Sequence, residues 1–292
     1  MLLAAFEIVG GDSTASWTVH IDGGAAMLKY FKPHGPHVRM LVQFCLSTCV
    51  KCITKGEPGP TSIVEWCNSQ LGYISRPEQH AFPLVGMVCR LVTIYSAFKK
   101  GSYVGIEETM VEELLSLESE LDVWESQVPE NWTFTIESTT DDVGETMYLG
   151  QYHVYQELWT ARLYTNYRWA RILVNELIWL NISKLPLTEE NGRQQRRSLE
   201  VVSNMATDII CSISTFFRQH TTSSTKRQNL PPVSAVFLLL FPVAVAGGAI
   251  GVSQELHDWA IKILSIIGNT FGTKGLRERW GKGEMDLYFD IA

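Results

Sequence analysis

The sequence is short of basic residues. It has 24 lysines and arginines against 31 aspartates and glutamates, which gives a formal net charge of -7. A chain that binds nucleic acid on its own needs a dense basic surface to neutralise phosphates. The basic clusters here are short, and we interpret them as solvated surface: Arg193, Arg196 and Arg197, and Lys226 and Arg227. We therefore expect no direct DNA binding by this chain alone.

The sequence also lacks the short motifs that bind phosphates, activate nucleophiles or hold catalytic zinc. It contains no GxSxG, GxGxxG, P-loop or HExxH. His20, His153 and His257 have no carboxylate or cysteine at a spacing typical of a metal site. No set of residues supplies a base, a nucleophile and a charge stabiliser together. The sequence thus predicts a protein that is not an enzyme, with no catalytic residues, metal or cofactor.

Cysteine spacing gives no sign of a zinc cluster. Only Cys49 and Cys52 have CxxC spacing, whereas a zinc binuclear cluster needs two such pairs among lysines. On a helix, Cys45, Cys49 and Cys52 share one face, where free cysteine behaves as a small buried hydrophobe. The amino terminus lacks the positive lead of a secretory signal. We expect reduced core thiols at all six positions, Cys45, Cys49, Cys52, Cys67, Cys89 and Cys211.

Apolar residues are present in helical rather than strand periodicity. With 292 residues and 46% hydrophobic content, the chain can bury a sizeable core. The periodicity and the glycine and proline breaks predict an all-α single domain over 1–292, an array of predominantly antiparallel helices. The predicted helices cover 2–9, 17–31, 37–54, a short segment from Ser62, 83–99, 105–127, 189–218, 233–252 and 253–267. Residues 128–150 lose this periodicity and predict an extended internal loop, in which a local sheet pair near 132–136 is compatible with the all-α class.

The stretch 152–180 is the predicted centre of the array. It contains no glycine or proline and predicts a helix about 45 Å long. Its main stripe is apolar except for one asparagine: Tyr152, Tyr155, Trp159, Leu163, Asn166, Ala170, Leu173, Leu177 and Leu180. A second stripe carries Tyr164, Arg168, Arg171 and Asn175. We expect the two arginines to pair with acids of neighbouring helices, and the alternative is an anion-binding ridge for an effector.

The central stretch also resembles a known family. The resemblance rests on Tyr155, Trp159, Ala161, Tyr164, Asn166, Tyr167, Arg168, Arg171 and Ile172. These residues are similar to the signature helix of the fungal-specific transcription factor domain, the regulatory region of fungal zinc-binuclear-cluster transcription factors. Other blocks follow the family pattern in order: Phe6, Glu7, Trp17, His20, Gly24, Ala25 and Leu28; then Trp124, Pro129 and Trp132; then 206–213; and 233–252 with His257, Trp259 and Ile261.

The resemblance implies a function without DNA recognition. It implies a regulator of transcription in the nucleus that contacts a protein partner or a second copy of itself, and a small-molecule effector. The family's zinc cluster, which reads DNA, has no counterpart here. Met1 stands close to the first matching block, so the chain is expected to correspond to the later part of such a regulator and to be short at its amino terminus relative to the family.

A helical enzyme is one alternative. Asp141, Asp142 and Glu145 spell DDxxE, the magnesium-binding motif of terpene-synthase-like enzymes. The second metal motif expected downstream is poor, because Asn269 and Thr273 are followed by Arg277 where a carboxylate should stand.

An integral membrane protein is the other alternative. The uncharged run 233–252 has about the length that a bilayer demands. Pro242, Gly247 and Gly248 interrupt it, and no cationic flank follows. We expect instead a buried core helix covered by the central helix and by the helix over 253–267.

Overall fold

The computed structural model describes residues 16–30, 37–70, 72, 74, 76–102, 107–138, 148–218 and 233–271. The described chain is all-α with a small two-stranded sheet, as predicted. The predicted helix over 2–9 lies outside the described residues. The amino-terminal elements are α2 (Ser16–Met27), η1 (Leu28–Tyr30), α3 (His37–Lys55), α4 (Thr61–Gln70), α5 (Arg76–Gln79), α6 (Ala81–Lys99) and α7 (Glu107–Ser126). They are followed by η3 (Glu130–Trp132), β1 (Phe134–Ser138), β2 (Gln151–Tyr155), α8 (Leu158–Ile182), α9 (Glu189–Arg218), α10 (Val233–Gly248) and α11 (Gln254–Phe271).

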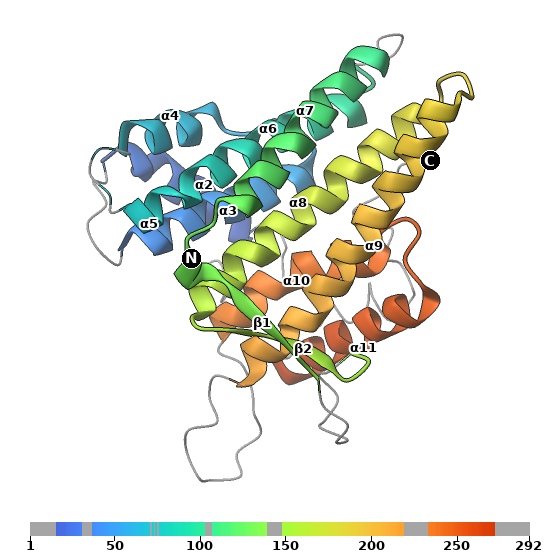
Figure 1. Cartoon of the computed structure of the whole chain (residues 1–292). Helices are drawn as coiled ribbons and strands as arrows, with labels where there is room; N and C mark the ends of the chain where they lie inside the picture. Colours follow the sequence, from blue (N-terminus) through green and yellow to red (C-terminus); the bar gives the residue numbers. More distant parts are fainter. Residues whose placement is uncertain are drawn as a thin grey trace.

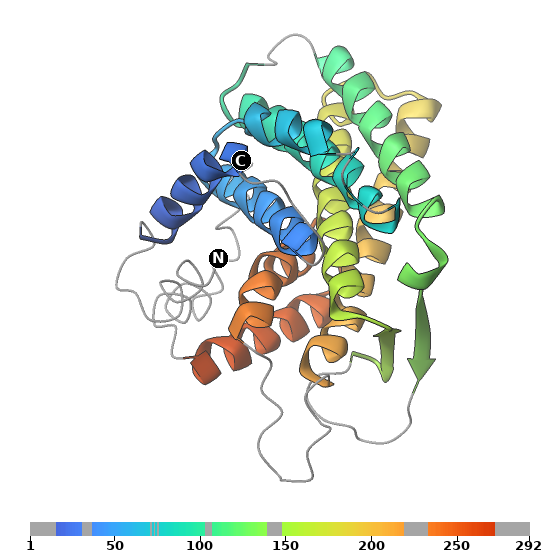
Figure 2. The same cartoon turned by 90° about the vertical axis from the view of Figure 1, so that its left-hand side faces the viewer.

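Helix α8 is the central element of the fold. It runs between α7 and α9, which pack along it from two sides (Figure 1). Helices α3 and α6 lie on another side of α8 (Figure 2). Helix α10 packs on α8 as well, and α11 packs on α10. Nearly every side chain of α8 is buried, from Trp159 to Ile182. The prediction of a central core helix is therefore confirmed, with the helix shorter at its amino-terminal end than expected.

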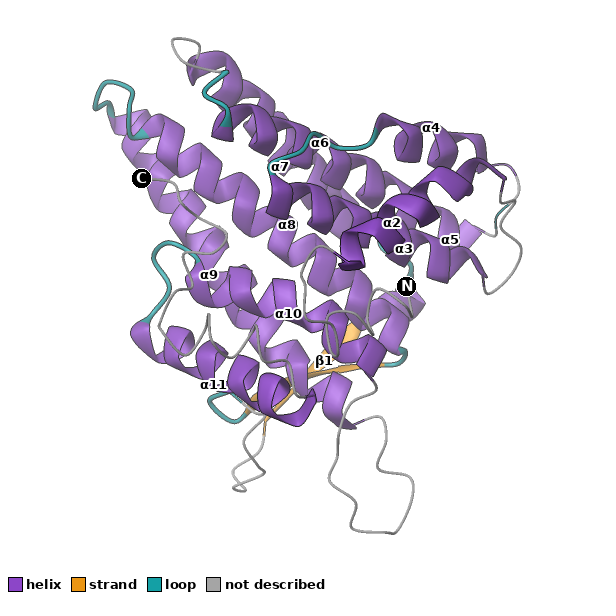
Figure 3. Cartoon of the chain, turned by 180° about the vertical axis from the view of Figure 1, so that it is seen from behind, coloured by secondary structure: helices purple, strands orange, loops and turns teal. Residues whose placement is uncertain are grey.

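The predicted start of this helix at residue 152 is wrong. Residues 151–155 form β2, which pairs antiparallel with β1 so that Phe134 faces Tyr155 and Ile136 faces His153. Aromatic and β-branched side chains suit a pleated, half-buried surface, and this pairing overrides the helical spacing of Tyr152 and Tyr155. The strands are the orange elements among the helices in Figure 3. The predicted loop over 128–150 thus includes β1 and η3, while 139–147 lie outside the described residues.

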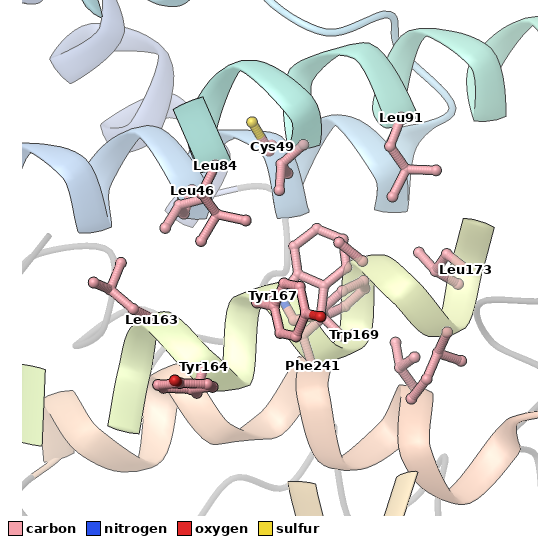
Figure 4. Packing of buried hydrophobic residues seen from close by; sticks show 14 of the residues in the cluster. Leu46, Cys49, Leu84, Leu91, Leu163, Tyr164, Tyr167, Trp169, Leu173 and Phe241 are labelled. Carbon is pink, nitrogen blue, oxygen red and sulfur yellow. The ribbon is translucent and has the colours of Figure 1, made fainter. Parts of the chain in front are cut away.

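The described side chains of helix α10 are mostly buried, as predicted, and the helix ends at Gly248 rather than at residue 252. It packs against α8, α9 and α11, and Phe241 makes an edge contact with Trp169 of α8 at 5.1 Å between ring centroids. Close to the end of α10, the backbone N–H of Ile250 donates a hydrogen bond to the carboxyl group of Glu176 on α8 (2.8 Å). Figure 4 shows Trp169 and Phe241 in the core where α8 and α10 meet. These contacts fix α10 on the central helix.

One described helix is long and apolar enough to cross a membrane, judged by length and composition alone. It is α6 rather than α10, which is shorter, and 67% of the apolar window of α6 is buried inside the structure. A core helix meets the same two criteria, so α6 by itself is weak evidence for a membrane protein.

All six cysteines are buried and free, as predicted. Cys45, Cys49 and Cys52 lie in the buried set of α3, and the Cys49 and Cys89 sulfur atoms are 3.4 Å apart across the α3–α6 contact. Burial raises the pKa of Cys52 to about 11. Because the thiolate is the reactive form, the thiol of Cys52 is a poor nucleophile.

Candidate functional site

The two arginines of the predicted ridge lie on α8 three residues apart, and both are buried. Arg168 is 0% exposed and Arg171 is 6% exposed. Residues at this spacing share a face of a helix but are rotated from one another. Arg171 accordingly contacts α7, whereas Arg168 contacts α9 and the strand pair. We call the two sets of contacts the Arg171 centre and the Arg168 centre.

The Arg171 centre joins α8 to a row of acids on α7. The guanidinium of Arg171 binds the carboxylate of Glu118 through Nε (3.0 Å) and also through Nη2, and it lies 3.3 Å from Asp122 and 3.6 Å from Glu125. The Tyr167 hydroxyl accepts a hydrogen bond from Arg171 (2.7 Å) and donates one to Glu125 (2.7 Å). The predicted pairing with acids of a neighbouring helix is thus confirmed.

Burial of Glu118 corrects one expectation about α7. The helical spacing of the apolar residues in this segment predicts a buried stripe, which the structure confirms: Met110, Leu114, Leu117, Leu121 and Trp124. The same spacing predicts that the many glutamates of α7 face water, but Glu118 is 7% exposed. Burial raises the pKa of the Glu118 carboxyl group, and the hydrogen bond and charge of Arg171 offset this only in part. Burial would lower the pKa of Arg171, but Glu118 outweighs it and the pKa is raised.

The Arg168 centre joins α8 to α9 and to β2 mainly through neutral groups. Nη1 of Arg168 donates to the Tyr155 hydroxyl (2.6 Å), to the Ser212 hydroxyl (2.6 Å) and to the Asp208 backbone carbonyl (3.3 Å). Nε lies 3.5 Å from the Asp208 carboxylate, and this is the one acid paired with Arg168 in the described part of the chain. The guanidinium also lies over the Phe134 and Tyr164 rings, at 5.0 and 5.2 Å.

The fold also brings His153 next to a serine and an aspartate. His153 Nδ1 is 3.2 Å from the Ser212 hydroxyl oxygen, and Nε2 is 3.7 Å from the Asp208 carboxylate. The expectation from the sequence concerned only metal-site spacing, and the structure adds a carboxylate contact from a distant part of the chain. The partners come from α9, more than fifty residues later in the chain, so no local spacing in the sequence could indicate this contact. The one indication in the sequence is the block 206–213, which contains both partners. The resemblance to the family identified this block but did not indicate what it contacts.

This Ser–His–Asp set lacks the properties of a hydrolytic triad. Such a triad needs an accessible serine and a base with a pKa near the working pH. Ser212 is fully buried and donates its proton to the Asp208 backbone carbonyl (2.7 Å). Burial, and next the charge of Arg168, lower the pKa of His153 to about 3, so the imidazole is a weak base. The set acts as a polar contact that holds β2 and α9 against α8.

Most of the remaining candidate residues lie outside the described part of the chain, and the described ones lie on separate helices. Asp141, Asp142, Glu145, Thr273 and Arg277 lie outside the described residues, and Asn269 is exposed at the end of α11. His257 is engaged with the backbone carbonyl of Gly247 (2.8 Å), and His20 is half-buried on α2. Across the described ranges, no group of three or more histidine, cysteine, aspartate or glutamate residues could hold a metal ion.

Comparison with known proteins found no match to a family model, to a curated protein or to a solved structure.

Proposed function

We propose that this chain is a non-catalytic regulatory domain of the kind found in fungal zinc-cluster transcription factors, which acts in the nucleus. In this proposal it contacts a protein partner or a second copy, responds to a small-molecule effector, and does not bind DNA by itself. One observation carries the proposal. The α8 residues on which the resemblance rests are all buried: Trp159, Ala161, Tyr164, Asn166, Tyr167, Arg168, Arg171 and Ile172.

Those residues have the physical character of a framework rather than of an active site. Through Arg171 they connect α8 to α7, and through Arg168 they connect it to α9 and β2. Buried ion pairs and hydrogen bonds fix the positions of the helices that meet at them. A residue pattern that specifies such an arrangement supports a role in presenting surfaces to other molecules. It does not favour catalysis, because its reactive groups are already engaged with one another.

Reporter transcription tests the regulatory role. The full chain is fused to a zinc-cluster DNA-binding domain of known target and compared with that domain alone. We expect the fusion to change reporter output, and we expect Arg171→Met, which leaves Glu118 buried without its partner, to lose this change. Arg193→Met, on the exposed side of α9, is the matched control and should behave as the unaltered fusion. An unchanged reporter with a fusion present at normal levels would contradict the proposal.

Gel retardation tests the expected absence of DNA recognition. Major-groove readout needs basic side chains on an element that enters the groove, and an acidic chain also repels the phosphate backbone. We expect the purified chain to give no retardation at low salt. Sequence-dependent retardation at sub-micromolar protein would show that the chain reads DNA.

Two further measurements test the alternatives, an integral membrane protein and a helical enzyme. Extraction by alkaline carbonate is expected, whereas a requirement for detergent would favour a membrane protein, with α6 as its candidate span. No turnover of a prenyl diphosphate with magnesium is expected, and turnover abolished by Asp141→Ala would favour the helical enzyme.

A further inference from the structure

Strand β1 has an unpaired edge. In the described part of the chain the sheet has two strands, so β1 pairs with β2 on one side and with no strand on the other. Strand β2 lies against α9, where the Thr215 hydroxyl donates a hydrogen bond to the backbone carbonyl of His153 (2.6 Å). Figure 2 shows β1 at the outside of the molecule, with β2 between it and the helices. The outer backbone N–H and C=O groups of β1 are therefore available to another strand.

The beginning of β1 is held in place, whereas the rest of the strand is exposed. Phe134 stacks on the His153 ring at 4.5 Å between centroids, and the Arg168 guanidinium lies 5.0 Å from its ring. The next four residues are exposed, and Ile136 at the centre of the strand is 64% exposed. Strands β1 and β2 pair without a bulge.

The sequence of β1 does not protect its edge. Soluble proteins commonly protect an edge strand with lysine, proline or a bulge, which prevent pairing with another chain. Strand β1 reads FTIES, which contains neither lysine nor proline and carries one charge, that of Glu137. An exposed, regular edge of this kind suits the addition of a further strand.

A second copy of β1 fits this edge in the antiparallel orientation. With Ile136 on a two-fold axis, it faces Ile136 of the other copy, and Thr135 faces Glu137. Phe134 then faces Ser138. Facing residues are an even number of positions apart in the sequence. Because alternate residues of a strand direct their backbone groups to the same edge, the outward groups of the two copies meet.

The charges favour this antiparallel arrangement. The Glu137 carboxylate of one copy faces the Thr135 hydroxyl of the other, which can donate a hydrogen bond to it. The two Ile136 side chains meet at the centre, where apolar cross-strand pairs are stabilising. Parallel pairing in register would instead place Glu137 beside Glu137, and like charges at that position are destabilising.

We propose that two copies of this chain associate through antiparallel pairing of their β1 strands, which forms a continuous four-stranded sheet. The contact is isologous, so it closes as a dimer and leaves no β1 edge unpaired. Two strands of five residues bury little surface, so the dimer should dissociate on dilution. The proposal assigns a contact surface to the second copy named in the proposed function, and it rests on that function in this respect only.

Sedimentation equilibrium of the purified full chain over a range of concentrations tests the contact. We expect a reversible monomer–dimer equilibrium. Ile136→Lys should weaken the dimer at least about 10-fold, because two ammonium groups replace the central apolar pair. Leu187→Lys is the matched control, since Leu187 is 93% exposed beyond the other end of α8, and it should dimerise as the unaltered chain. A chain that stays monomeric, or a dimer that Ile136→Lys leaves unchanged, would overturn the proposal.

Circular dichroism checks that Ile136→Lys acts on association. Because Ile136 is exposed, the variant should keep the helical spectrum of the unaltered chain. A loss of helix in Ile136→Lys would place this residue in the folding of the monomer and overturn its role in the dimer contact.

Cysteine cross-linking tests the register. Facing residues of an antiparallel pair have Cα atoms about 4.5 to 5.5 Å apart, which a disulfide can span. A mixture of Thr135→Cys and Glu137→Cys should give a covalent dimer on mild oxidation, and each variant alone should give much less. The six native cysteines are buried, and the unaltered chain measures their background. No cross-linking in the mixture, or cross-linking of Thr135→Cys with itself as in parallel pairing, would overturn the proposed contact.

The dimer and the regulatory function can fail separately. A dimer of the purified chain with no change in the reporter would retain the β1 contact and reject the regulatory function. A change in the reporter with a chain that stays monomeric would retain the function and reject self-pairing, which would leave the β1 edge to an extended segment of another protein.

Discussion

The Arg171 and Arg168 centres compensate the burial of an arginine charge in different ways. Arg171 meets three carboxylates of one helix, so charge compensates its burial. Arg168 is more deeply buried, yet one carboxylate lies near it, and hydroxyl groups, a backbone carbonyl and aromatic rings supply most of its contacts. The two centres therefore differ in the acid that would remain unpaired if the arginine were removed. Removal of Arg171 strands the buried Glu118, whereas Asp208, with its side chain 32% exposed, can regain water.

The largest expected effect follows from that difference. Arg171→Met should lower the free energy of unfolding by about 3 to 5 kcal/mol, because breaking a buried pair leaves an uncompensated charge. Arg168→Met should lower it by roughly half as much, since the hydroxyls of Tyr155 and Ser212 still contact one another at 2.9 Å. Urea denaturation of both variants measures the two values. A loss in Arg168→Met equal to or greater than that in Arg171→Met would show that burial depth, not the stranded acid, sets the effect.

The kind of contact made by these arginines could be predicted from the sequence, but their partners could not. Buried arginine is usually paired, so pairing with acids was expected for both arginines before the structure showed which acids they meet. The boundaries of α9 were also predictable, since this helix begins and ends at Glu189 and Arg218 as its periodicity indicated. The contact of His153 with α9 depends on long-range packing, which the spacing of neighbouring residues in the sequence cannot predict. Residues 152–155 satisfied both helical and strand periodicity, and pairing with β1 decided between them.

The response to acid should separate the two centres, because the Arg168 centre contains an imidazole. The pKa of His153 falls from 6.5 in the unfolded chain to about 3 in the folded one. His153 therefore contributes stability that is present above pH 6.5 and is lost as the pH falls toward 3. The slope is at most about 1.4 kcal/mol per pH unit, or about 2 kcal/mol between pH 6.5 and 5.

His153→Gln is the matched variant for this response. It should remove that part of the slope, while Tyr167→Phe in the Arg171 centre should keep it. Urea denaturation at several pH values measures both, and the difference from the unaltered chain cancels the contribution of the other histidines. Parallel pH profiles for His153→Gln and the unaltered chain would mean that His153 gains a proton in the folded state without penalty.

The smallest expected effect compares the tyrosine of each centre. Tyr155→Phe removes an acceptor from a fully buried arginine whose Nη2 already lacks a hydrogen-bond partner, so it should lower the free energy of unfolding by about 1 to 2 kcal/mol. Tyr167→Phe should lower it by about 0.5 to 1 kcal/mol, because Glu125 is 34% exposed at its side chain and water can replace the lost hydroxyl. The double variant Tyr155→Phe with Arg168→Met tests the assignment, since the two losses should be less than additive if the hydroxyl acts through Arg168. Additive losses would place the role of Tyr155 in its contact with Ser212 instead, and the Arg168 centre would then owe its stability to the α9–β2 contact rather than to the arginine.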